Sequence, residues 1–309
     1  MTPREHRVVI ERLLGTRVMV RLRGEGDLVA TERAIIAEIE RLEDLLSAFR
    51  PESEWCRWRR GEVASPAPEI VALLDLAAYW FERSGGAFHP TSGALHARWL
   101  RAVDEQTVPD RDEMAELAAS VAHLPYRVLD GRDGRQVEPL GDCTQLDLHA
   151  IAKGWIIDRG LDVLSMFDGI IDALLDAGGD MRHVGPDAVT IGVEDPRRPF
   201  DNVPPLEQVR ISNEAIASSS GARRPHRIGR QRFTHVLDPR TGWPVGEVLG
   251  TTVIAPDAAT ADAAATVVGV LPVVEGLAFV ESLSADERRV ATSLLEADGT
   301  VHRSARWPD

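Results

Sequence analysis

The sequence predicts an α+β fold, in which helices flank a mostly antiparallel central sheet. Strand-like and helix-like runs alternate irregularly along the 309 residues, without the strand–helix–strand repeat that builds a parallel sheet. Neither G-x-x-x-x-G-K-S/T nor a G-x-G-x-x-G that follows a strand occurs, so the common nucleotide-binding loops of parallel folds are absent. No internal duplication or low-complexity tract divides the chain.

The N-terminal part begins with strands and continues with helices. Residues 7–23 alternate apolar and charged side chains around a central glycine, which indicates a pair of strands or a broken strand. Residues 31–48 place apolar side chains at helical spacing, and Thr31 is a reasonable N-cap. A second helix is expected over 65–84, because Ser-Pro stands at its start and Gly-Gly follows its end.

The remaining segments mix turns, strands and helices. Residues 102–142 are polar and turn-rich, and within them the run DGRDGRQVEPLGD (130–142) indicates a hairpin or loop and is the best candidate for an internal boundary. Near the C-terminus, an Asp298-Gly299 turn predicts a hairpin. The other expected elements are, in chain order, a helix over 150–168, a short apolar run over 172–180, a strand over 188–199, strands at FTHVLDP (233–239) and GTTVIAP (250–256), and an alanine-rich helix over 257–271.

Composition narrows the class of protein. The net charge of −14 and the pI near 5.1 argue against sequence-independent binding to nucleic acid or to an anionic membrane. Two cysteines, Cys56 and Cys143, are too few for a disulfide framework and are expected to pack in the core. We see no signal peptide, lipobox-like cysteine or membrane span. As written, the chain is expected in the cytoplasm, and outside it only if a leader is missing.

Two segments combine charged residues with expected helix starts. In QLDLHAIAKGW (145–155), Asp147 is expected at a strand end just before a helix, and Lys153 follows inside it. A helix N-terminus favours anions, so a lysine there would make sense beside a bound phosphate. The alternative is that Asp147 is an ordinary N-terminal helix residue and Lys153 is solvated. In DAATADAAAT (257–266), Asp262 and Thr266 lie four apart and therefore share a helix face.

The oxygens of that second pair suit a hard cation such as Mg²⁺, and the surrounding alanines leave space for a ligand. The alternative is an aspartate favoured by the helix dipole and a threonine bonded back to its own helix. Two further signals are weaker alone. Gly178-Gly179 allows a close backbone approach or a simple turn. His235, before an Asp-Pro turn, could be a general base or a half-buried strand histidine.

Taken together and in this order, these segments resemble the family of FAD:protein FMN transferases, also called ApbE-like flavin transferases. The resemblance covers nearly the whole chain, so we expect one such domain over 1–309. No single motif decides it, although H-x-x-D-P-x-T-G is fairly specific. The motifs that carry it are LGTRVMVRL, RLEDLLSAFRPESEWCRW with Phe49 at its aromatic position, GGAFHPTSGALHARW, LDLHAIAKGWIID, LLDAGGDMRHVG, GVEDPRRP, FTHVLDPRTGWPV and VIAPDAATADAAATVVGVL.

The resemblance implies a fold, an activity and a site. The fold would be T-fold-like, with two tightly joined subdomains and the site between them. The activity would be Mg²⁺-dependent transfer of the FMN half of FAD to a Thr or Ser hydroxyl of an acceptor protein, which releases AMP. His235 would be the general base. Mg²⁺ would be held by Ala150 (through its carbonyl), Asp262 and Thr266, and the FAD contacts would come from Leu14, Phe49, Ala87, Phe88, His89, Asp147 and Lys153.

This chain departs from the family pattern at several positions. Leu14 replaces the usual methionine, and His89 stands where aspartate is usual, which changes the charge at an expected cofactor contact. His149-Ala150 replaces a common pair of small residues. The segment 216–227 is unusually rich in arginine, and Arg223 and Arg224 could bind phosphate or be solvated, the latter being favoured.

Two alternative activities use the same residues. The chain could hydrolyse FAD to FMN and AMP with water as the acceptor, or it could bind FAD without reacting. The sequence does not name the acceptor protein, does not choose between monomer and dimer, and does not choose between Mg²⁺ and Mn²⁺.

Overall fold

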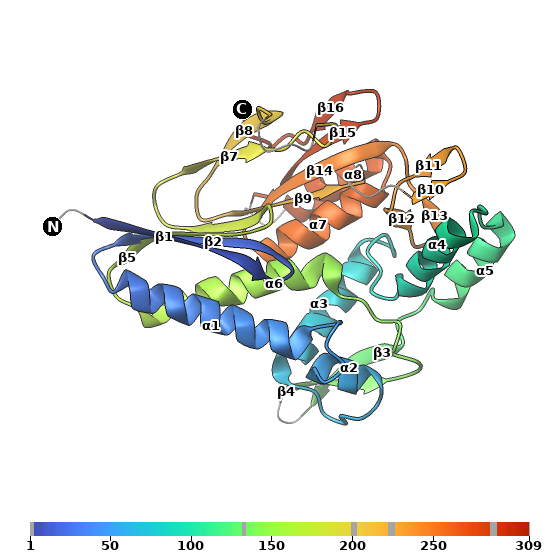
Figure 1. Cartoon of the computed structure of the whole chain (residues 1–309), viewed down its shortest axis with the longest axis horizontal. Helices are drawn as coiled ribbons and strands as arrows, with labels where there is room; N and C mark the ends of the chain where they lie inside the picture. The colour runs from blue at the N-terminus through green and yellow to red at the C-terminus, as the bar shows by residue number, and fades with distance from the viewer. Residues whose placement is uncertain (1–2, 132–133, 199–202, 222–225, 285–288, 309) are drawn as a thin grey trace.

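The structure, a computed structural model, describes residues 3–131, 134–198, 203–221, 226–284 and 289–308. Its largest element is an eight-stranded sheet in the order β1-β2-β5-β6-β9-β14-β15-β16 (Figure 1). Every pair of neighbours in this sheet is antiparallel, which confirms the expected class. The strands are β1 Arg4–Leu13, β2 Thr16–Gly24, β5 Ile170–Ala177, β6 Asp180–Val184, β9 Ala215–Ser220, β14 Val248–Ala255, β15 Ala291–Glu296 and β16 Val301–Arg303.

Helices cover one face of the sheet, and the main hydrophobic core lies between them and the strands. The alternating side chains of β2 bury Val18, Val20 and Leu22 in this core, as the period of a strand requires. The helices are α1 Leu28–Leu46, α2 Glu54–Arg59, α3 Pro68–Arg83, α4 Gly93–Glu105, α5 Arg111–Ser120, α6 His149–Asp162, α7 Ala258–Val270 and α8 Val273–Leu283, with a 3₁₀ turn at Val163–Met166.

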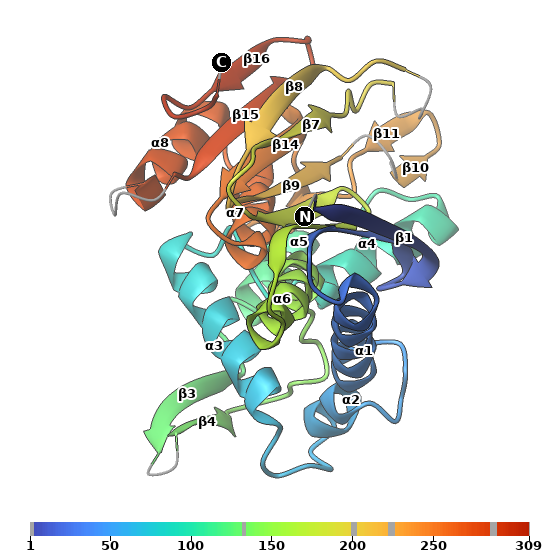
Figure 2. The ribbon, with the colours of Figure 1, turned by 90° about the vertical axis from the view of Figure 1, so that its left-hand side faces the viewer.

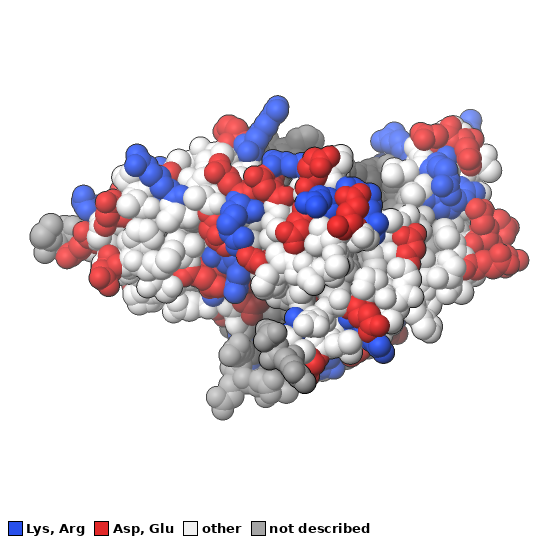
Figure 3. All heavy atoms as spheres, turned by 90° about the horizontal axis from the view of Figure 1, so that it is seen from below, with Lys and Arg blue, Asp and Glu red and all other residues white. Residues whose placement is uncertain are grey.

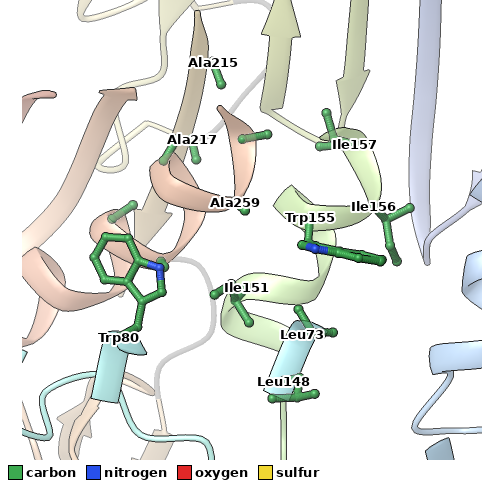
Figure 4. Close-up of a cluster of buried hydrophobic side chains, with 14 of the residues drawn as sticks. Leu73, Trp80, Leu148, Ile151, Trp155, Ile156, Ile157, Ala215, Ala217 and Ala259 are labelled. Atoms are coloured by element: carbon green, nitrogen blue, oxygen red, sulfur yellow. The ribbon is translucent and has the colours of Figure 1, made fainter. Parts of the chain in front are cut away.

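α6 and α7 form the centre of the molecule. α6 contacts α1, α3 and α7, while α7 packs directly on β9 and β14. Figure 4 shows side chains of α6, among them Ile151, Trp155 and Ile157, between the neighbouring helices and the sheet. Alanine and valine fill almost all sides of α7, because a helix buried all round needs small or apolar residues everywhere. Both helices were expected from the sequence.

Four short hairpins complete the fold. The β7–β8 hairpin (Val189–Val193 and Glu207–Ile211) covers the opposite face of the sheet and closes a second core with Ile216 and Ile254. The β3–β4 hairpin (Tyr126–Gly131 and Gly134–Pro139) lies near α3, at the other end of the molecule from β15 and β16 (Figure 2). The last two are β10 His226–Ile228 with β11 Gln231–Phe233, and β12 Leu237–Asp238 with β13 Trp243–Pro244.

Several local predictions were wrong. The N-cap of α1 is Asp27, which accepts from Ala30 N, while Thr31 lies inside the helix and bonds back to the Asp27 carbonyl. The polar region 102–142 contains the β3–β4 hairpin, which confirms the hairpin or loop expected at 130–142, but it also contains α5, which was not expected. The FTHVLDP run is not one strand: β11 ends at Phe233, a bend follows at His235, and β12 begins at Leu237. α2 and α4 were not expected.

The surface carries charges of both signs. On the face seen in Figure 3, Lys and Arg are interspersed with Asp and Glu. Both cysteines are free and buried, as expected. No helix in the described parts of the chain combines the length and the apolar character that crossing a bilayer requires.

Candidate functional site

The antiparallel contact between α6 and α7 builds the centre of the site. Gly154 N donates to Asp262 Oδ2 at 3.0 Å. One turn further along α6, the Asp158 carboxylate accepts from Ala258 N and Ala259 N at 2.8 and 2.9 Å and so caps α7. These contacts set the register of the two helices.

One turn back from Gly154 is Ala150, and one turn on from Asp262 is Thr266. By helix geometry, the antiparallel register turns the part of α6 that holds Ala150 towards the part of α7 that holds Thr266, while the role of these residues as metal ligands stays a prediction. All three belong to regular helices, so their positions depend on the packing of α6 against α7.

Asp262 sits in an electrostatically unusual position. Burial raises the pKa of its carboxyl group to about 7, and the negative charge of Asp180 adds to that shift. The positive charge of Lys153 and the hydrogen bond from Gly154 oppose it only in part. An anionic carboxylate held in such surroundings is stabilised by a bound cation. The donor set of carboxylate, hydroxyl and backbone oxygen therefore fits a hard metal ion.

Lys153 is held in an ion pair and only 33% of its side chain is exposed, so the interpretation as a simply solvated lysine is wrong. Its Nζ lies 2.7 Å from Asp180 Oδ2, and the Asp180 side chain is only 4% exposed. Asp180 also accepts a hydrogen bond from Ser218 N on β9. The neighbouring carboxylates raise the pKa of Lys153 despite its burial, so the lysine keeps its charge. Asp180, at the start of β6, was not among the candidate residues.

His149, the first residue of α6, contacts both Asp147 and Phe49. Asp147 lies in a loop, not at a strand end as predicted, because β4 ends at Pro139 and irregular chain follows. Its carboxylate accepts from His149 N at 2.8 Å and pairs with the imidazole of the same residue. The His149 ring lies 5.4 Å from the ring of Phe49, which is 84% exposed. Phe49 thus projects into solvent beside the start of α6.

Leu14 lies at the tip of the β1–β2 hairpin with a positive φ of 54°, and it packs against the main core. The hairpin contacts the Gly178-Gly179 turn, where Gly178 N donates to Arg17 O at 3.1 Å. Gly178 has a φ of +67°, and a side chain there would overlap Thr16. The two glycines are therefore needed for a tight turn that brings β6, and with it Asp180, next to the hairpin tip.

Ala87, Phe88 and His89 are buried between α3 and α4. His89 Nδ1 lies 2.8 Å from Thr91 Oγ1 and accepts from Thr91 N at 3.3 Å, so the ring replaces the short acceptor that an aspartate would supply. Burial lowers the pKa of His89 to about 4, so this histidine is neutral near pH 7. A cavity of about 460 Å³ lies beside it and reaches Pro239 and Arg240.

His235 is half-buried in the bend between β11 and β12. Its neighbour Thr234 packs so closely on Gly221, just after β9, that a side chain at Gly221 would overlap it. The turn that follows is rigid, since Asp238 accepts from the Arg240 backbone and binds its guanidinium at 2.8 Å. The sequence had predicted such a turn.

Other aromatic and imidazole groups line this side of the molecule. Trp243 packs against Trp99 at 5.2 Å between ring centroids, with Arg111 over its face, so packing explains it as expected. His96 and His226 were not singled out from the sequence. His96 is close enough to Asp147 for that carboxylate to raise its pKa, although burial lowers it overall. A single histidine within a helix is too common a pattern to have identified His96 from the sequence.

Arg223 and Arg224 fall outside the described residues. No group of three or more His, Cys, Asp or Glu side chains in the described ranges could hold a metal ion without other ligands. The candidate centre has one carboxylate, one hydroxyl and one backbone oxygen, so further oxygen ligands would have to come from a substrate.

Comparisons with known proteins identify the family of this chain. The sequence profile of the ApbE family matches residues 14–289. The chain belongs to the ApbE family. Among its ApbE relatives, the FAD:protein FMN transferase of Treponema pallidum is 29% identical over 288 residues, covering 84% of this chain and 77% of that protein. The FAD:protein FMN transferase of Klebsiella pneumoniae is 28% identical over 272 residues, covering 86% and 83%.

Solved ApbE structures share the fold. The ApbE protein of Thermotoga maritima superposes with a TM-score of 0.76 at 25% identity, covering 98% of this chain and 97% of that one. The flavin transferase ApbE of Vibrio cholerae gives the same TM-score at 22% identity, with 98% of each chain covered. The mixed helix and sheet architecture expected from the resemblance is therefore confirmed.

Proposed function

We propose that this ApbE protein transfers the FMN half of FAD to a threonine or serine hydroxyl of an acceptor protein and releases AMP. Its relatives are named for this activity. The observation that carries the proposal is the Asp262 carboxylate, whose pKa burial raises, beside Thr266 and the start of α6. That arrangement suits a Mg²⁺–pyrophosphate complex better than an ordinary core.

We assign the metal to Asp262, Thr266 and the carbonyl of Ala150. When bound, Mg²⁺ would act as a Lewis acid that neutralises charge on the pyrophosphate. Lys153 would supply a second positive charge close to this centre, since it keeps its proton beside Asp180. Leu14, Phe49, Asp147 and the 87–89 segment would contact FAD.

In the proposed transfer step, His235 is the general base. The acceptor oxygen forms a bond to the phosphorus of the FMN half, while the bond from that phosphorus to the bridging pyrophosphate oxygen breaks. The electron pair of that bond leaves with AMP. The hydroxyl proton goes to the imidazole of His235, because histidine is the side chain that most often accepts protons near neutral pH. Positioning and charge stabilisation carry most of such a reaction.

The test is incubation with FAD, Mg²⁺ and threonine-containing peptides. A peptide that gains the mass of FMN, together with an equal amount of AMP, supports the transferase. Release of FMN and AMP without any labelled peptide would favour the hydrolase instead. FAD that stays intact with Mg²⁺ present would refute catalysis and leave only a binding protein.

We also propose that residues 1–309 form one domain. The family profile spans most of the chain, and the eight-stranded sheet joins its N-terminal and C-terminal strands. Limited proteolysis should then leave no stable fragment that lacks either α6 or α7.

A further inference from the structure

The eight-stranded sheet has a long open edge at β1. This strand, Arg4–Leu13, is the terminal strand of the sheet and pairs with β2 on one side (Figure 1). In the sheet that the described residues form, no strand pairs with its other side. The opposite edge, β16, is only three residues long. β1 therefore offers a row of backbone N–H and C=O groups with which another strand can pair.

The two faces of β1 differ in their surroundings. Val8 and Ile10 point towards the helices and pack against the main core, and His6 on the same face binds α1. The alternate residues point to the other face and are exposed, namely Glu5, Arg7, Val9 and Glu11. Val9, in the middle of the strand, is 39% exposed. Pairing along this edge would cover an apolar side chain that the sheet leaves in contact with solvent.

Two charges on this exposed face lack partners. Across the β1–β2 pair, Arg7 lies opposite Arg21, so its cross-strand neighbour carries the same charge. Among the described residues, neither Arg7 nor Glu11 has a salt bridge. Like charges that face each other destabilise a sheet, whereas opposite charges stabilise it. Both side chains are therefore available to a partner on the open side of β1.

We propose that β1 pairs antiparallel with β1 of a second copy of this chain, about a twofold axis that passes through the sheet at Val9. In that register, Val9 faces the partner's Val9. Arg7 faces the partner's Glu11, and by symmetry Glu11 faces the partner's Arg7. On the helix face, Val8 and Ile10 of the two copies lie opposite each other and extend the apolar surface of the core.

The charges on β1 select this register. A twofold axis keeps the helices of both copies on one side of the joined sheet. Because opposite residues of antiparallel strands point to the same side, the pairing must be centred on a residue and not between two. A centre at Arg7 would place two arginines face to face, and a centre at Ile10 would separate Arg7 from Glu11. A centre at Val8 would place Glu5 opposite the partner's Glu11 twice.

The competing interpretation is that these charges only keep the edge from pairing, as they do in many sheets, and that the protein is a monomer. The register of β1 against β2 shifts between Ile10 and Leu13, which confines regular pairing with a second copy to the middle of the strand. So short a stretch predicts a reversible dimer, whose population depends on protein concentration. Pairing of β1 is independent of the proposed activity.

Sedimentation equilibrium of the full chain measures the association. We expect the average mass to rise with concentration from 33.8 kDa towards twice that value. Arg7→Glu and Glu11→Arg each place like charges opposite one another twice, and each should raise the dissociation constant about 30-fold. The double variant Arg7→Glu/Glu11→Arg exchanges the charges and should dimerise within about threefold of the parent. Glu116→Arg, exposed on α5, is the matched control.

Cross-linking tests the centre of the pairing. Opposite residues of antiparallel strands have Cα atoms about 4.5–5.5 Å apart, which a disulfide can span. Under mild oxidation, Val9→Cys should therefore form a disulfide with its copy in about tenfold higher yield than Glu5→Cys, which does not face itself. The two native cysteines are buried and give the same background in both variants. Thermal unfolding checks that every variant is folded.

A mass of 33.8 kDa at every concentration up to about 0.5 mM would overturn the proposal. A dimer whose dissociation constant is unchanged by the single charge reversals would do the same, as would equal disulfide yields at the two cysteine positions. A double variant that remains as weak as the single variants would show that Arg7 does not face Glu11 of a second copy.

Discussion

The backbone N–H of Gly154 donates to the carboxylate of Asp262 across 3.0 Å and so joins the two central helices at the candidate metal centre. The absence of a side chain at Gly154 makes this approach possible, because an added Cβ would overlap the Ala258 carbonyl. A single glycine therefore sets the distance between the helices that carry Ala150 and Thr266.

The contact between Gly154 and α7 should not tolerate a side chain. Gly154→Ala should push α6 away from α7 and cost about 3 kcal/mol of unfolding free energy, as overpacking of a dense core does. Mg²⁺-dependent FAD cleavage should fall with it. Urea unfolding followed by circular dichroism measures the first effect. The control is Gly246→Ala, because an added Cβ at Gly246 would meet open space. Equal stability of both variants would contradict the prediction.

Asp262→Asn should separate activity from stability. The variant keeps the shape but loses the charge, and we expect a loss of about 100-fold in AMP release together with loss of Mg²⁺ binding by calorimetry. Burial raises the pKa of Asp262 to about 7, so the folded state loses stability as pH rises towards that value. Asparagine removes this loss, and the variant should melt no lower than the parent at pH 8. Asp298→Asn, in the C-terminal turn, is the control. A large fall in melting temperature would show that the carboxylate is structural.

Lys153 and Asp180 should behave as a coupled pair. Lys153→Met leaves the Asp180 carboxylate buried without its cation, and we expect a loss of about 3 kcal/mol of stability. Adding Asp180→Asn should restore much of it, because no uncompensated charge then remains. If Lys153 also contacts the pyrophosphate, AMP release by the double variant should remain slower than in the parent protein even though its stability is restored. Additive losses in a double-mutant cycle by urea unfolding would exclude the coupling.

His89 should make the fold sensitive to acid. Burial lowers its pKa from 6.5 to about 4, so between these values the unfolded chain binds the proton more readily than the folded protein. Its contribution to stability is therefore present above pH 6.5 and is lost as pH falls towards 4, by at most about 3 kcal/mol. His89→Asn keeps an acceptor for Thr91 and does not titrate, so its stability should fall less between pH 7.5 and pH 5. Identical pH profiles in urea unfolding would refute the assignment.

His235→Ala tests the assigned base. We expect loss of FMN transfer to peptides by about 100-fold, with FAD binding largely unchanged, because a general base contributes to the reaction and little to binding. FAD binding is measured by quenching of flavin fluorescence and transfer by mass spectrometry. His302→Ala, in the C-terminal hairpin, is the matched control. Transfer at the normal rate would show that His235 is not the base.

The sequence predicted the fold class and most of the long elements because their signals are local. The alternation in β1 and β2 and the apolar spacing of α1 each depend on a few neighbouring residues. The N-cap of α1 was misplaced because Asp27 and Thr31 are both plausible caps, and only the geometry separates them. The two-residue strands β12 and β13 pair across a rigid turn, which periodicity cannot detect.

The placement of Asp262 and Thr266 on one helix was predictable, because both lie within one turn of α7. It was not predictable where the partners come from distant segments. The Lys153–Asp180 ion pair joins a helix to a strand, and the sequence offered for Lys153 only solvent or phosphate. The buried state of His89 likewise depends on packing among α3, α4 and the loop before α6. Such contacts follow from the tertiary fold and leave no mark in the local pattern.

The alanine-rich surface of α7 has a consequence for how this protein tolerates change. Alanine has no side-chain rotamers to lose, and the oxygen atoms of the candidate centre are positioned by the crossing of two backbones. Substitutions on the outer helices and hairpins can therefore accumulate while those oxygens stay in place. Relatives that share barely a quarter of their residues with this chain can retain one architecture for this reason, and the positions most resistant to drift should be the smallest side chains.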